Sequence, residues 1–82
     1  MKNDELFMQL IAIFHASALQ GMGKMKNPVT EKTEVNVEQA SHAINMLDML
    51  REKTNNNLDD ALQRSLNQVI SDLKLNFTDI KK

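Results

Sequence analysis

The chain of 82 residues contains no cysteine and no tryptophan, and it has only two glycines and one proline. Without cysteine, disulfide bonds, thiolate zinc sites and thiol chemistry are excluded, which fits a reducing compartment and leads us to expect a cytoplasmic protein. Two glycines cannot build a phosphate-binding loop or a dinucleotide fingerprint, and no nucleophile elbow is present. No cofactor is therefore predicted.

An excess of charge of one sign is also missing, because ten Lys and Arg face eleven Asp and Glu, for a formal net charge of -1. A nucleic-acid-binding protein normally carries a basic surface for phosphate contacts, so we expect no nucleic-acid partner. The carboxylates are numerous, but none falls in an apolar stretch where a catalytic acid/base pair would need to lie. These absences predict a protein that is not an enzyme.

The most apolar part of the sequence runs from Leu6 to Leu19. As a helix it would rise about 21 Å, short of the roughly 30 Å hydrocarbon core of a bilayer, so we expect no membrane span. Residues 16–18 (Ala-Ser-Ala) are similar to a signal-peptide cleavage site, yet Lys2 is offset by acidic neighbours, whereas export signals begin with net positive charge. We interpret the run as a core helix over about residues 4–20, which Gly21 can end in a left-handed cap.

Two further helices are predicted after a long loop. Residues 21–36 hold both glycines and the only proline without helical periodicity, which indicates a connection. A helix is predicted over 37–53, because Asn36 can cap its first turn and apolar side chains recur on one half of the cylinder. A third helix over about 58–79 carries one apolar stripe, and the short turn before it predicts an antiparallel helical hairpin. The predicted fold is all-α, in a single domain over residues 1–82.

Apolar side chains cover roughly 240° of the circumference of the first predicted helix, more than two neighbouring helices can bury. The simplest way to bury the remaining apolar surface is to pack this helix against the same helix of a second copy, since two-fold dimers are the commonest oligomers. We therefore predict an oligomeric helical bundle, with a homodimer favoured. The residues predicted to mediate self-association are Phe7, Leu10, Ile11, Phe14, His15 and Ala18.

Two other ways to bury the apolar surface of this helix remain as alternatives. The loop could fold back over it with Met22, Met25, Val29 and Val35, although a mostly polar segment provides little apolar area. The helix could instead lie on a membrane surface, but it lacks the basic polar face that such helices use. The homodimer is the interpretation that leaves the least apolar surface in water.

Two histidines are the candidates for ligand chemistry. His15 falls inside the apolar arc, where we expect a neutral, hydrogen-bonded imidazole or a pH-sensitive contact between subunits. His42 follows Glu38 at a four-residue spacing that could place two ligands on one metal ion, although a solvated helix face explains the same pattern. Met49 projects away from the apolar half of its helix and is a candidate contact with another chain.

Residues along most of the chain resemble one known family. They are Asn27-Pro28 with Thr30, the apolar positions Val37, Ala40, Ile44, Leu47 and Leu50, then Glu52-Lys53-Thr54, Asn57-Leu58 and Asp72-Leu73-Lys74-Leu75. Together with the apolar first helix, they resemble DUF1844, a family of small bacterial proteins of unknown function. Asn55-Asn56-Asn57 stands where the family usually has Lys-Gly-Asn, and asparagine can replace glycine at a left-handed cap. The resemblance implies a helical fold and no catalytic residues.

These features predict a non-enzymatic helical protein that self-associates and mediates protein–protein interaction, with another cytoplasmic protein as a further partner. The alternative is a small-molecule or metal-binding module that uses His15 or His42. The two predictions differ in whether the surface takes a second chain or a small ligand.

Overall fold

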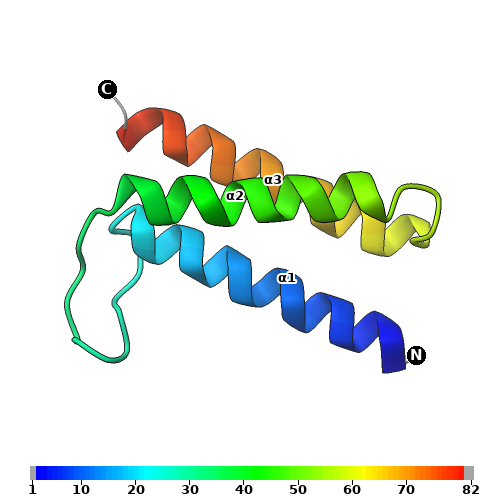
Figure 1. The fold of residues 1–82 in the computed structure, drawn as a ribbon, viewed down its shortest axis with the longest axis horizontal. Coiled ribbons are helices and arrows are strands. Elements are labelled where there is room, and N and C mark those ends of the chain that lie inside the picture. The colour runs from blue at the N-terminus through cyan, green and yellow to red at the C-terminus, as the bar shows by residue number, and fades with distance from the viewer. Residues whose placement is uncertain (1, 81–82) are drawn as a thin grey trace.

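The computed structural model describes residues 2–80, apart from the side chain of residue 2, and consists of three helices (Figure 1). α1 spans Lys2–Gly21, α2 spans Val37–Lys53 and α3 spans Asp60–Ile80. No strand occurs in this part of the chain, and the all-helical prediction is confirmed. α2 and α3 run in opposite directions, joined by a short turn (Figure 1).

Side-chain caps determine where α2 and α3 begin. The Asn36 side chain accepts a hydrogen bond from the Gln39 backbone N–H at 3.1 Å, as a helix N-cap does. The Asp59 carboxylate accepts one from the Leu62 N–H at 2.8 Å, so α3 starts at the next residue and later than position 58. Between the two helices, Asn56 adopts a positive φ of 70°, which lets the chain turn back.

The end of α1 differs from the prediction that Gly21 forms a left-handed cap. The positive φ of 73° belongs to Gly23, and the N–H groups of Gly23 and Lys24 bond back to carbonyls in the last turn of α1, as in a Schellman motif. Gly21 is needed for a different reason, because a Cβ there would lie 2.7 Å from the backbone nitrogen of Ala40. Its missing side chain lets α1 and α2 approach closely at this end.

The core lies between the three helices, and α2 packs against both of the others. The buried residues of α2 and α3 recur every three or four positions, so each helix contributes one face. α1 contributes less, since only two of its apolar side chains are fully enclosed. The buried apolar residues are Ile11, Ala18, Met22, Ala40, Ala43, Ile44, Leu47, Leu62, Leu66, Ile70 and Leu73.

The loop between α1 and α2 projects from one end of the bundle (Figure 1). Its base is closed by a hydrogen bond from the Asn36 N–H to the Gly21 carbonyl at 2.7 Å, and Met22 forms an isolated bridge with the returning chain. Its tip is a turn in which the Asn27 side chain accepts from the Val29 N–H at 2.8 Å. Met22 is buried, whereas Val29 is 88% exposed. The loop therefore leaves the outer face of α1 open.

Candidate functional site

The outer face of α1 is apolar and exposed. Leu6, Leu10 and Ile13 share one side of the helix through their three- and four-residue spacing. Leu6 is 58% exposed, Ile13 is 62% exposed and Leu10 is half-buried. Among the described residues, no helix combines the length and apolar composition that a membrane crossing requires.

A hydrogen bond joins α1, which carries this stripe, to α2, which also carries exposed apolar side chains. The Gln39 side-chain amide donates to the Ser17 carbonyl of α1 at 3.0 Å. α1 and α2 are antiparallel, and both extend from this bond toward the other end of the bundle (Figure 1). Leu10 and Ile13 of α1 therefore lie alongside the part of α2 that carries Met46 and Met49.

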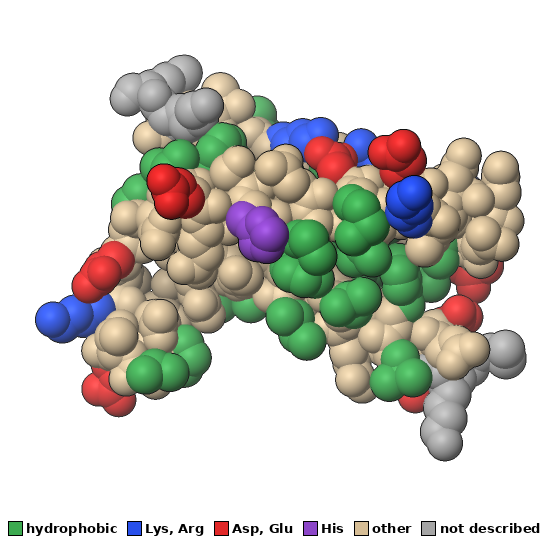
Figure 2. Space-filling model, in the orientation of Figure 1, with side chains coloured by type: hydrophobic (Ala, Val, Ile, Leu, Met, Phe, Trp, Pro, Cys, Tyr) green, Lys and Arg blue, Asp and Glu red, His purple; other side chains and the backbone are tan. Residues whose placement is uncertain are grey.

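We refer to Leu6, Leu10, Ile13, Met46 and Met49 as the α1–α2 face. Figure 2 shows hydrophobic side chains gathered over both helices in the middle of this side of the molecule, with charged side chains around them. Met49, the candidate contact with another chain, is 38% exposed and so is accessible to one. A contiguous apolar patch in contact with water is typical of an interaction surface.

The residues predicted for self-association lie at different depths in the structure. Ile11 and Ala18 are buried in the core of the single chain, so they offer no surface to a second copy. Phe7 and Phe14 are half-buried and pack against that core. Most of the predicted set therefore joins α1 to its own subunit.

Of the six residues predicted for self-association, Leu10 is the one that also belongs to the α1–α2 face. His15 is half-buried on α1 and lies outside this face. The most exposed members, Leu6 and Ile13, were not singled out from the sequence. Helical periodicity defines a wide apolar arc on α1, but it does not say which part of the arc the other helices cover.

The histidines do not form a metal site in the structure. His15 lies on α1, and His42 is exposed on α2 together with Glu38, one turn before it. Within the part of the chain that the structure describes, no group of three or more His, Cys, Asp or Glu side chains is placed to hold a metal ion. The metal-binding alternative has no support from this geometry.

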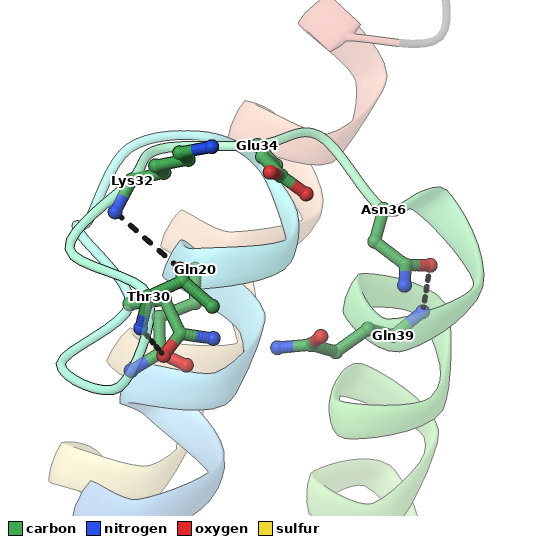
Figure 3. A pocket seen from close by; sticks show the side chains of 7 residues that line it. Gln20, Thr30, Lys32, Glu34, Asn36 and Gln39 are labelled. Carbon is green, nitrogen blue, oxygen red and sulfur yellow. Dashed lines mark hydrogen bonds between the residues drawn. The ribbon is translucent and has the colours of Figure 1, made fainter.

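A polar hollow lies between the loop and the adjoining ends of α1 and α2 (Figure 3). Its volume is about 220 Å³. No periodic pattern indicates this hollow, because most of its lining comes from irregular loop residues that the chain brings together only on folding. The residues that line it are Gln20, Asn27, Thr30, Lys32, Glu34, Asn36 and Gln39.

The family Domain of unknown function (DUF1844) matches residues 5–79, almost the whole chain. The chain belongs to this family. The resemblance to DUF1844 inferred from Asn27-Pro28 and the apolar positions of α2 is therefore confirmed. No curated protein and no solved structure matches the chain. Membership of DUF1844 establishes kinship and assigns no activity.

Proposed function

We propose that this DUF1844 chain is a non-enzymatic helical module that forms a homodimer through its α1–α2 face. The observation that carries the proposal is that Leu6 and Ile13, on one side of α1, are both more than half exposed. Removing apolar surface from water is favourable by about 25 cal/mol per Å². A two-fold axis lets a single patch cover its own copy, so no other surface has to be complementary.

The accessible surface area of the chain supports this proposal. The chain exposes 5786 Å², whereas a compact monomer of 9.3 kDa would expose about 5,000 Å². The difference, about 800 Å², is close to what one partner contributes to an interface of standard size. The projecting loop and the α1–α2 face are both exposed parts of this surface.

The shape of the chain also suits a second copy. Its principal dimensions are 36 × 27 × 16 Å, and its radius of gyration is 13.1 Å, compared with about 11.7 Å for a compact domain of this length. A second copy placed on the broad side of such a flat molecule would add thickness where the single chain is thinnest. The α1–α2 face lies on a broad side (Figure 2).

The composition of the α1–α2 face is that of an interface with an apolar centre and a polar rim. Met46 and Met49 are unbranched and can adjust to the opposing surface. His42, one turn before Met46, and Lys53, one turn after Met49, are both exposed. Polar groups at the edge of an apolar patch are typical of specific protein interfaces.

The mass of the chain in solution tests the proposal. Light scattering at several concentrations should give twice the 9.3 kDa of one copy for the wild-type chain. Leu6→Glu and Ile13→Glu each place a charge in the interface, so we expect each to weaken dimerisation at least about tenfold. A single 9.3 kDa species at every concentration would overturn the proposal.

Leu75→Glu provides the matched control. Leu75 is 71% exposed on α3 and is not part of the α1–α2 face. The proposed interface requires its substitution to leave the dimer intact. Equal weakening by Leu75→Glu and Ile13→Glu would show that the effect comes from added charge and not from this face.

A second candidate function is contact with a different protein through the loop tip. Val29 is almost fully exposed, and the Asn27 carboxamide oxygen accepts hydrogen bonds from the N–H groups of Val29 and Thr30 at 2.8 and 3.4 Å. A side chain held out on an ordered turn loses little entropy on binding. A protein that the wild-type chain retains on a column and Val29→Ser does not would support this function, and equal retention would refute it.

A further inference from the structure

The polar hollow has the composition of a small-ligand site. Four carboxamide side chains line it, together with one hydroxyl, one ammonium and one carboxylate group. A carboxamide offers both a hydrogen-bond donor and an acceptor, so it can pair with either kind of polar group. None of the described residues that line the hollow is apolar. A ligand for it must therefore be polar over most of its surface.

The adjoining ends of α1 and α2 position the side chains that line one side of the hollow. Gln20 comes from the last turn of α1 and Gln39 from the first turn of α2, and the two side chains lie across from each other (Figure 3). The Gln39 amide nitrogen is held by the Ser17 carbonyl, which leaves the Gln39 side-chain oxygen as an acceptor. The Asn36 oxygen is held by its cap bond, which leaves the Asn36 amide nitrogen as a donor.

Lys32 and Glu34 bring opposite charges to the loop side of the hollow (Figure 3). Among the described residues, ion pairs form only around Asp48, far along α2, and neither loop residue takes part in one. Hydrogen bonds between charged groups are the stronger ones in proteins, and both of these charges are free to form them. A solute with one cationic and one anionic group would complement the pair.

The volume limits the size of that solute. A hollow of about 220 Å³ is several times larger than the roughly 30 Å³ that one water molecule occupies, so it has room for a small free amino acid. We propose that the hollow binds a free α-amino acid with a small polar side chain. Lys32 pairs with its carboxylate, Glu34 pairs with its ammonium group, and the carboxamides of Gln20 and Gln39 bond to its side chain. A polyol would satisfy the carboxamides and leave both charges without partners.

Titration of the 82-residue chain with L-serine, followed by two-dimensional ¹H–¹⁵N NMR, tests this proposal. We expect saturable shifts at Gln20 and over residues 27–39, and no saturable shift in α3. Glycerol, sodium acetate and methylammonium chloride, each at the same concentration, should give no saturable shift. The absence of saturation with L-serine, or equal saturation with any of these three solutes, would overturn the proposal.

Substitutions at the rim give an independent readout. Lys32→Gln and Glu34→Gln each remove one charged hydrogen bond, so each should weaken L-serine binding about tenfold. Lys26→Gln is the matched control, because Lys26 is exposed on the same loop and does not line the hollow. Equal affinities of the Lys32→Gln and Lys26→Gln chains would contradict the assigned pairing. The dimer is measured by mass, so its failure and the failure of this site are distinguishable.

Discussion

The side-chain amide nitrogen of Gln39 lies 3.0 Å from the main-chain carbonyl oxygen of Ser17. This bond joins the first turn of α2 to the last turns of α1, close to the glycine contact between the same two helices. Gln39 is half-buried, so water competes only partly for its amide. The bond therefore sets the register of α1 against α2, on which the alignment of the two apolar stripes depends.

Gln39→Leu removes this bond and keeps a side chain of similar length. We expect the free energy of unfolding to fall by about 1 kcal/mol, the net value of a typical hydrogen bond. Urea denaturation followed by circular dichroism measures it. Gln68→Leu is the comparison, because its exposed bond to Asp72 on the same helix should be worth only a few tenths of a kcal/mol. Equal losses would contradict the role given to Gln39.

Gly21→Ala tests the close approach of α1 and α2. A Cβ at this position would lie 2.7 Å from the backbone nitrogen of Ala40 and 2.9 Å from the carbonyl oxygen of Asn36. Both neighbours are backbone atoms, so the helices must move apart, at a cost of about 1–3 kcal/mol. We expect a lower Tm in thermal denaturation. Alanine is the better helix former by about 1 kcal/mol, so a higher Tm would show that the helix ends separate without penalty.

Asp48 on α2 connects to α3 through charge. Its carboxylate lies 2.7 Å from the Arg51 guanidinium and 2.9 Å from the Lys74 ammonium group. The three side chains are 32% to 52% exposed, so solvent screens the pairs, and we expect Asp48→Asn to cost less than about 1 kcal/mol. The difference in urea stability between the two chains should shrink as sodium chloride is raised. A difference that persists unchanged in molar salt would contradict an electrostatic origin.

Much of the fold follows from local patterns in the sequence. The apolar positions of α2 and α3, such as Leu47, Leu66 and Leu73, recur with the helical period and are the ones that become buried. Asn36 forms the cap that its residue type and position predict. These features depend on neighbours a few residues away, so the sequence alone is sufficient to predict them.

Other features depend on how the helices meet. Leu6 and Ile11 are equally apolar, yet one is exposed and the other buried, because only the packing of α1 against α2 and α3 separates them. The need for Gly21 arises from Ala40, a residue distant in sequence, and not from the helix cap. The polar hollow likewise requires the loop to return beside Gln20. Periodicity carries no information about such long-range contacts.

The hydrogen bond between the Asn36 N–H and the Gly21 carbonyl pins both ends of the loop together. The backbone of the loop is therefore bonded to the bundle at its two ends, and doubling the length of a flexible loop costs only about 0.6 kcal/mol of closure entropy. A foreign epitope spliced in after Val29 would stand clear of the helices. The chain could thus serve as a miniature carrier for displayed sequences.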